Sequence, residues 1–341
     1  MWKKRLQSWM DRIPPRGTKE RRRFMLVTSL AACALYILLP MVVANTYVLH
    51  IVIVVGIYCI LALSLNLVVG FAGQLSFGHI AFYGVGAYTG ALLMLRLGVS
   101  FWLALPISAL FSALAGFLLG LPTLRLRGDY LAIVTLGFGE IVRLVLINTT
   151  DLTRGPLGLP GIPAPKIFGY SFSGPVPYYY IIALLVAFTV FFLRRLTTSG
   201  IGLSMLTVKG DEIAASSIGI LPVKYKLMAF VLSSAFAGAA GTFYASYISF
   251  ISPDTFIYNG SVTILAMVVL GGLGSIPGSM IGAALLLVVP ELLRAANEYR
   301  MILYGLLMVV MMIYRPQGFW GMDKRVLNAY KLSAGGERRG K

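Results

Sequence analysis

The polar side chains of this apolar chain that could take part in chemistry gather in one short stretch. Gln74, Ser76 and His79 fall within the segment GFAGQLSFGHIAFYGVGAYTG, and Asn66 comes just before it. Amide, hydroxyl and imidazole groups donate and accept hydrogen bonds, and leaving them unpaired in lipid costs several kcal/mol. Their chemistry is therefore hydrogen bonding, either to a small polar molecule or to neighbouring helices in a tight packing seam.

Six glycines in the same stretch indicate a helix that is broken and closely packed. An interior helix glycine costs about 1 kcal/mol relative to alanine, so a segment that only spanned lipid would not use them. Residues 70–78 predict a broken helix whose backbone faces a cavity, and Gly86 with Gly90 predicts close helix contact. We interpret the following residues as a substrate path: Asn66, Gly70, Gly73, Gln74, Ser76, Gly78 and His79. For His79 the alternative is a packed histidine bonded to a backbone carbonyl.

No motif for catalysis or metal binding accompanies these residues. The sequence has no HExxH, no paired-cysteine motif and no phosphate-binding loop, and its two cysteines, Cys33 and Cys59, lie inside apolar runs. We therefore expect no catalytic residue, no metal, no cofactor and no ATP hydrolysis by this chain alone. An intramembrane enzyme would need a nucleophile with its base or a metal site, and the sequence offers neither.

Composition and charge indicate a membrane protein. Of the 341 residues, 58% are hydrophobic and 12% are charged, whereas soluble domains carry about 25% charged residues. Recurrent apolar runs of roughly 20 residues predict an all-α polytopic membrane protein, because barrel strands are much shorter. The net charge of +17 is concentrated in the two tails and in short loops, so it indicates membrane orientation and not nucleic-acid binding.

The elements that must position the polar stretch are about ten transmembrane helices with broken, glycine-rich segments. The predicted spans are 24–44, 47–69, 78–97, 101–121, 130–148, 178–193, 225–250, 261–272, 276–292 and 299–314. Residues 24–314 thus form one transmembrane domain between a basic cytoplasmic arm (1–23), which can rest on anionic membrane lipid, and a basic cytoplasmic tail (315–341).

Charge asymmetry tests this topology. Twenty-three of the 29 Lys and Arg residues fall on the predicted inner side and five on the outer side, as expected when both termini are cytoplasmic. In this arrangement 149–177 is an outer loop rich in Pro and Gly, and 196–225 is a cytoplasmic loop. Eight crossings with re-entrant hairpins is the alternative.

Helix-packing features recur along the chain. Small residues at four-residue spacing predict packing faces in two of the spans, at Ser108, Ser112, Gly116 and Gly120 and at Ser234, Gly238 and Thr242. Glu140 and Arg143 share a helix face and can form an ion pair, which acts either as a gate or coupling element or as a structural pair that fixes helix orientation. A weak sequence echo also links 70–78 with 271–278, as in transporters whose two halves each carry a broken helix.

The cytoplasmic loop contains a short predicted helix within VKGDEIAASSIGILP (208–222). Asp211 and Glu212 suit its first turn, and Gly219 followed by Pro222 suits its end. Its small apolar face, at Ile213, Ala214, Ser217 and Ile218, would fit a groove in a partner protein; the alternative is an amphipathic helix lying on lipid.

The chain closely resembles a known family, the LivM-type permease subunits of branched-chain amino acid ABC transporters. The resemblance covers about 63–321 and rests on the segments LNLVVGFAGQLSFGHIAFYGVGAYTGALL, LRLRGDYLAIVTLGFGEIVRLVL with RGPLGLPGIP, GDEIAASSIGI with FAGAAGTFYA, and VVLGGLGSIPGS with RPQGFWG. It implies that 24–314 is a permease domain in a bacterial plasma (inner) membrane. It also implies a LivH-like second permease subunit, two cytoplasmic ABC ATPase subunits, and an external or periplasmic solute-binding protein.

The same resemblance assigns the ATPase coupling motif of importer permeases to Asp211, Glu212, Ala214, Ala215 and Gly219. This sequence departs from the family pattern by inserting an isoleucine between Glu212 and Ala214. The family also includes permeases for urea and other small polar solutes, so the solute stays open. An ion-coupled secondary transporter is a further alternative; it would need a membrane carboxylate, and Glu140 is nearly the only candidate.

Overall fold

The computed structural model describes residues 45–123, 126, 128–167, 170–172, 174–292, 305 and 318. The predicted first span (24–44), the basic arm and, apart from residues 305 and 318, the last span and the tail lie outside the described residues. The chain divides into two compact units, 1–50 and 51–341. The first is described only at 45–50, and the description below concerns the second.

The described chain is almost entirely helical. The long helices are α3 (Thr46–Asn66), which continues as a π-helix η1 (Leu67–Phe71), α4 (His79–Arg96), α5 (Phe101–Thr123), α6 (Asp129–Asn148), α8 (Pro175–Thr197), α11 (Pro222–Ile248), α12 (Tyr258–Gly271) and α13 (Ile276–Leu292). Shorter helices are α7 (Thr150–Thr153), α9 (Gly200–Gly210), α10 (Glu212–Ser217) and the 3-10 turns η2 (Gly155–Leu157) and η3 (Pro253–Phe256).

Among the described residues, five helical segments are long and apolar enough to cross a membrane: α3 with η1, α5, α6, α8 and α11. Helices α12 and α13 are shorter apolar helices. The chain is therefore an all-α, multi-pass membrane protein, and the boundaries of these helices follow the predicted spans closely. Helix α5 runs through Pro122 to Thr123, two residues beyond the end of the predicted span at 121.

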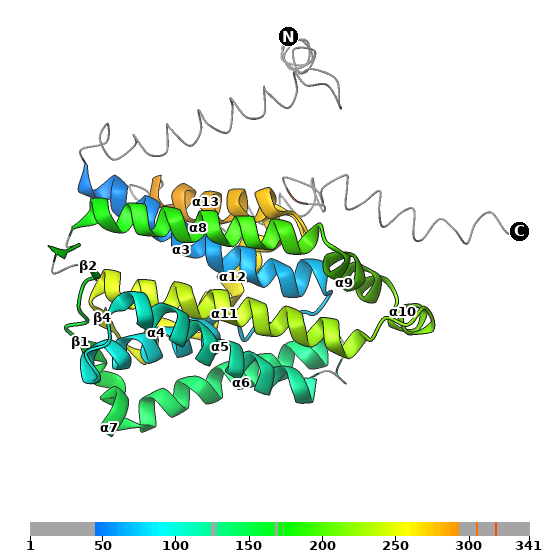
Figure 1. Ribbon diagram of the computed structural model, residues 1–341, viewed down its shortest axis with the longest axis horizontal. Helices are drawn as coiled ribbons and strands as arrows, with labels where there is room; N and C mark the ends of the chain where they lie inside the picture. Colours follow the sequence, from blue (N-terminus) through cyan, green and yellow to red (C-terminus); the bar gives the residue numbers. More distant parts are fainter. Residues whose placement is uncertain are drawn as a thin grey trace, which may run out of the picture. The chain divides into compact units, whose positions relative to one another are not determined.

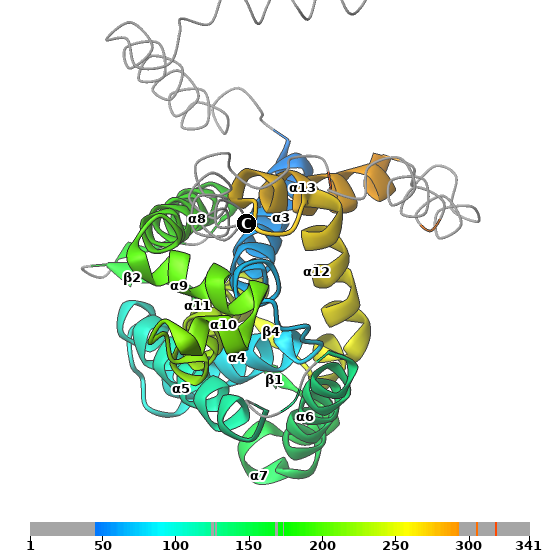
Figure 2. The same cartoon turned by 90° about the vertical axis from the view of Figure 1, so that its right-hand side faces the viewer.

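Helix α11 packs along α4 and α5, and the three lie side by side in both views (Figures 1 and 2). The small-residue faces predicted from the sequence meet here. A Cβ atom on Gly86 would lie 2.2 Å from the Cα of Gly238, and one on Gly238 would lie 2.2 Å from Ser112 Oγ. Thr242 Oγ1 donates a 3.0 Å hydrogen bond to the Gly86 carbonyl. Such small residues let helix backbones approach without the space that larger side chains would need.

The Pro- and Gly-rich loop is ordered by short pairings. Strand β1 (Leu159–Pro160) pairs antiparallel with β4 (Phe250–Ile251), so that Leu159 faces Ile251 and both are buried. Strands β2 (Lys166–Ile167) and β3 (Tyr170–Ser171) form a second hairpin. The loop after α6 is thereby attached to the chain that follows α11.

Candidate functional site

The break in the glycine-rich stretch begins as a π-helix. After Asn66 the α-helical pattern widens over Leu67–Phe71, where Ala72 N donates to Leu67 O at 3.1 Å and Gln74 N donates to Val68 O at 3.0 Å. Turns of this wider type occur where α-helices end. The sequence predicted a break at this position but not its π geometry.

Asn66 joins the break to the second glycine-rich turn, between α12 and α13. Its Nδ2 donates to the Ser275 carbonyl at 3.2 Å, and its Oδ1 accepts from Gly274 N at 2.8 Å. Gly70 also has no room for a side chain, because a Cβ there would lie 2.5 Å from Gly274 N. The two segments that echo each other in sequence therefore lie in direct contact, with Asn66 between them.

The second half of the segment is fixed by hydrogen bonds to other helices. Phe77 N donates to Thr135 Oγ1 of α6 at 3.0 Å, and a Cβ on Gly78 would lie 2.6 Å from the Thr135 carbonyl. His79 is buried, and its Nε2 lies 2.9 Å from Ser64 Oγ. Ser76 Oγ accepts from Gly78 N at 3.4 Å. His79 is thus packed between helices and has a hydroxyl partner.

Gln74 differs from its neighbours. Its side chain is 3% exposed, and neither Nε2 nor Oε1 has a hydrogen-bond partner among the described residues. A buried amide without partners costs about 1 to 3 kcal/mol. Such a group calls for an explanation, such as a water or ligand that supplies the missing bonds.

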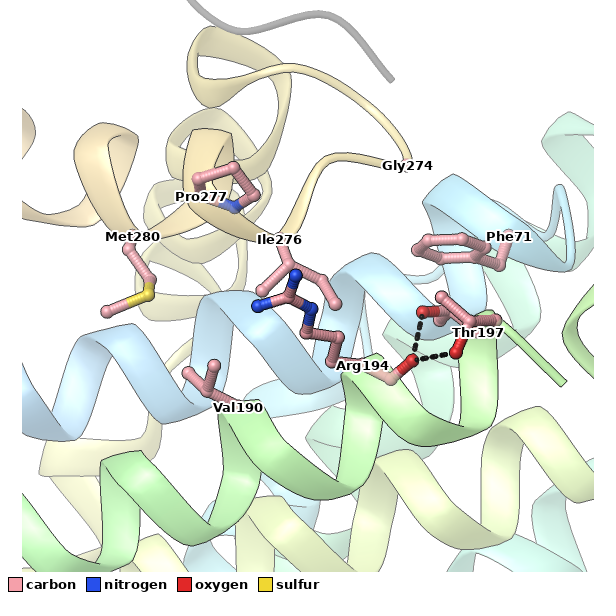
Figure 3. Close-up of a pocket in the computed structure, with 9 residues that line it drawn as sticks. Phe71, Val190, Arg194, Thr197, Gly274, Ile276, Pro277 and Met280 are labelled. Carbon is pink, nitrogen blue, oxygen red and sulfur yellow. Dashed lines mark hydrogen bonds between the residues drawn. The ribbon is translucent and has the colours of Figure 1, made fainter. Parts of the chain in front are cut away.

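A cavity of about 260 Å³ lies where η1, the second glycine-rich turn and the end of α8 meet (Figure 3). Its lining is mainly apolar and includes Phe71, Val190, Gly274, Ile276 and Met280, together with Arg194. Figure 3 shows the Arg194 guanidinium extending toward Ile276, while the Thr197 and Thr198 hydroxyls donate to the Arg194 carbonyl at 3.4 and 2.7 Å. The end of the broken helix therefore borders open space.

The predicted cytoplasmic helix forms α10, shorter than the stretch that suggested it. Asp211 is its N-cap, and Oδ1 accepts from Ile213 N at 2.7 Å and from Ala214 N at 3.1 Å. Gly219 follows the helix with φ of +82°, the left-handed conformation that favours glycine at a helix stop. Val208 belongs instead to α9, a helix that the sequence analysis missed.

One side of α10 faces the protein and the other is open. Ala215 is fully buried, and Glu212 forms an ion pair of 2.5 Å with Lys226 Nζ on α11. Lys226 is 4% exposed, so this pair holds α10 against the first turn of α11. On the open side Ile213 and Ile218 are 73% and 69% exposed. Exposed large apolar residues on a short, anchored helix are typical of a surface that contacts another protein or the membrane.

Lys209, which the sequence analysis did not select, links α9 to the broken helix. Its Nζ donates to the Gly70 carbonyl at 2.6 Å. Gly73 packs on its stem, since a Cβ there would lie 2.7 Å from Lys209 Cγ. Burial of the ammonium lowers the pKa of Lys209 below its ordinary value. No spacing rule in the sequence pairs positions 70 and 209, so only the fold reveals this contact.

Glu140 and Arg143 form part of a three-residue charge cluster. Arg143 Nε lies 3.1 Å from Glu140 Oε2, and Arg143 Nη1 lies 3.4 Å from Asp254 Oδ1 in η3. The Glu140 and Arg143 side chains are 39% and 26% exposed, so the pair lies at the rim of the described bundle and not in its core. The sequence predicted that Glu140 and Arg143 could pair but not that Asp254 joins them.

Comparisons with known proteins give consistent similarities. Residues 47–312 match the family described as the permease component of branched-chain amino acid transport systems. The chain is 47% identical over 305 residues to the high-affinity branched-chain amino acid transport system permease protein LivM of Salmonella typhimurium, covering 83% of this chain and 72% of that protein. The Escherichia coli LivM protein gives the same identity and coverage. The LivH permease of Salmonella typhimurium is 27% identical over 287 residues, covering 77% and 91%. No solved structure matches the chain.

Proposed function

This chain belongs to the permease-component family of branched-chain amino acid transport systems, and we propose that it carries branched-chain amino acids as one permease subunit of an ABC importer. The family match over 47–312 is the observation that carries this proposal. The family is a transport component and not an enzyme family, in keeping with the lack of any phosphate-binding loop in the sequence. Energy would therefore come from partner subunits.

The proposed assembly pairs this chain with a LivH-like permease, two cytoplasmic ATPases and an external solute-binding protein. Relatives named LivM and LivH both match the chain, which supports a pair of permeases. The exposed Ile213 and Ile218 on α10 support docking of an ATPase at this helix. The chain would cross a bacterial plasma (inner) membrane about ten times with both termini in the cytoplasm, as the distribution of Lys and Arg favours.

Within the proposed path, Gln74 is the residue best suited to contact the solute. A carboxamide can accept a hydrogen bond from an ammonium group and donate one to a carboxylate, and an amino acid carries both groups. Its neighbours Asn66 and His79 already have protein partners, whereas both polar atoms of Gln74 lack one among the described residues. We therefore assign Gln74 to solute contact and the other polar residues to positioning the break.

Reconstitution tests the function as a whole. The complete assembly in proteoliposomes should accumulate radiolabelled leucine when ATP is supplied on the ATPase side. This chain reconstituted alone should accumulate none. Uphill accumulation by the chain alone would contradict the proposal, and ATP-dependent uptake of urea without leucine would favour the small-polar-solute alternative.

Replacement of Gln74 tests the assignment within the path. The variant Gln74→Met keeps the side-chain length but removes the unpartnered amide, so it should raise stability by about 1 to 3 kcal/mol. If Gln74 contacts the solute, leucine uptake should fall at the same time, because the solute loses its hydrogen bonds. Unchanged uptake together with higher stability would show that the amide has no part in transport.

A further inference from the structure

The contact between Lys209 and Gly70 joins two regions that the proposed function treats separately. Lys209 lies in the last turn of α9, two residues before Asp211, the N-cap of α10. Its Nζ donates a 2.6 Å hydrogen bond to the Gly70 carbonyl in the π-helix η1. One side chain therefore connects the proposed ATPase-docking helix with the broken helix of the proposed path.

The hydrogen bond between Lys209 and Gly70 is favourable for both the ammonium group and the carbonyl. A helix leaves its last carbonyl groups without intrahelical partners, and a cation near this end is stabilised by the helix dipole. Gly70 is the fourth of the five residues of η1, so its carbonyl lies at that end. Gly73 adds a second contact, because its φ of +70° and the closeness of Lys209 Cγ both require glycine. Lys209 thus touches the chain on both sides of the helix end.

The broken helix has room to respond to this contact. Phe71, the residue after Gly70, lines the cavity of about 260 Å³ shown in Figure 3. Gln74 follows within the same turn of chain. A displacement of the Gly70 carbonyl would therefore move Phe71 beside open space, and it would reposition the buried amide that we assign to the solute.

Helix α10 is anchored directly after the end of α9, where Lys209 lies. An ion pair joins Glu212 of α10 to Lys226 of α11, and only Asp211 separates α10 from the end of α9 at Gly210. Motion passes between sites most directly through short chains of bonded and packed residues. Here the chain of contacts runs from α10 through Lys209 to Gly70.

We propose that Lys209 is the positioning residue that transmits movement of α10 to the end of η1, so that the partner ATPases control the solute path through the Gly70 carbonyl. This inference rests on the proposed function for the identity of the driving partner. The competing interpretation is that Lys209 only satisfies a helix-end carbonyl and contributes stability alone.

Nucleotide-dependent labelling separates the two interpretations without reference to the solute. The complete assembly would carry Leu75→Cys in a background with Cys33→Ser and Cys59→Ala. Maleimide labelling of position 75 would be timed with and without ATP. Lys209→Met removes the donor at similar length, Lys209→Arg keeps a donor, and Lys224→Met removes an exposed lysine near the start of α11 as the matched control.

With Lys209 present, ATP should change the labelling rate about tenfold, within the usual range of coupling between two sites. Lys209→Met should abolish this ATP dependence while assembly and basal ATP hydrolysis persist, with a modest fall in thermal stability because the buried Gly70 carbonyl loses its donor. Lys209→Arg should restore at least part of it, and Lys224→Met should leave it intact. ATP-dependent labelling that persists in Lys209→Met would overturn the proposal. So would loss of assembly in that variant, because the lysine would then be required for the structure itself.

The same preparation distinguishes failure of this inference from failure of the proposed function. If the solute is not a branched-chain amino acid, leucine uptake is absent in every variant, yet the ATP-dependent labelling still follows Lys209. If the solute is right and Lys209 has no role, leucine uptake and labelling are the same in Lys209→Met and in the parent protein.

Discussion

Adding a single methyl group to Gly86 tests the packing of α4 against α11. In Gly86→Ala the new Cβ would lie 2.2 Å from both the Cα and the carbonyl oxygen of Gly238. Carbon atoms in contact prefer about 3.5 to 4.0 Å, so the helices would have to separate by roughly 1 to 2 Å. Overpacking of this kind costs about 1 to 3 kcal/mol.

The separation would also affect a hydrogen bond. Thr242 Oγ1 donates to the Gly86 carbonyl at 3.0 Å, and stretching such a bond by more than 1 Å forfeits about 1 kcal/mol. The total cost is therefore about 2 to 4 kcal/mol. Against it stands the gain of up to about 1 kcal/mol when alanine replaces glycine within a helix.

A matched variant removes that gain from the comparison. Gly137 lies inside α6, and a Cβ there would meet no atom of the described residues within 4 Å. Gly137→Ala should therefore keep the helix-propensity gain without the clash, and the two variants should differ by about 2 to 4 kcal/mol. Equilibrium unfolding of the purified proteins in mixed micelles, followed by circular dichroism, gives the difference directly. Equal stability of Gly86→Ala and Gly137→Ala would refute the close packing of α4 and α11.

Three further predictions concern the loop at 196–225. Asp211→Ala should cost about 1 kcal/mol of α10 stability and speed amide hydrogen exchange in that helix, whereas Asp211→Asn, whose side chain can still cap, should change little. Equal exchange rates in the two variants would argue against the cap. Glu212→Gln leaves Lys226 buried without its charge partner and should destabilise the protein by about 3 kcal/mol or more. Lys226→Met leaves only a partly exposed carboxylate and should cost less in the same unfolding assay. A larger loss of stability in Lys226→Met than in Glu212→Gln would contradict the burial of Lys226. Because burial lowers the pKa of Lys209 in the folded chain, this group makes the stability of the fold rise with pH between its lowered pKa and the ordinary value of 10.5. An NMR titration of ¹³C-methylated Lys209 should have a midpoint below 10.5, and a midpoint at or above that value would contradict the effect of burial.

The helices and their packing faces were largely predictable from sequence because both depend on short-range patterns. Apolar runs fixed α5 and α8 to within a few residues, and four-residue spacing of small side chains located the faces at Gly86 and Gly238. Asp211, Gly219 and Pro222 likewise marked the ends of α10, since capping depends on residues only a few positions apart.

What could not be predicted depends on residues far apart in sequence. The contacts from Asn66 to Gly274 and from Lys209 to Gly70 have no local signature, because hydrogen bonds between distant segments follow from tertiary packing. Polarity alone likewise placed Asn66, Gln74 and His79 together as equivalent candidates. Only the fold distinguishes the two that have protein partners from Gln74, which has none among the described residues.

The hydrogen bonds of Asn66 have a consequence for biosynthesis. Its partner Gly274 N lies 208 positions later in the chain. At about 5 to 20 residues per second, a ribosome needs roughly 10 to 40 seconds to synthesise that interval. Throughout that time the newly made Asn66 amide lies within the bilayer without the backbone groups to which it binds in the folded protein. The first half of the protein can therefore reach its final state only after most of the second half has been made.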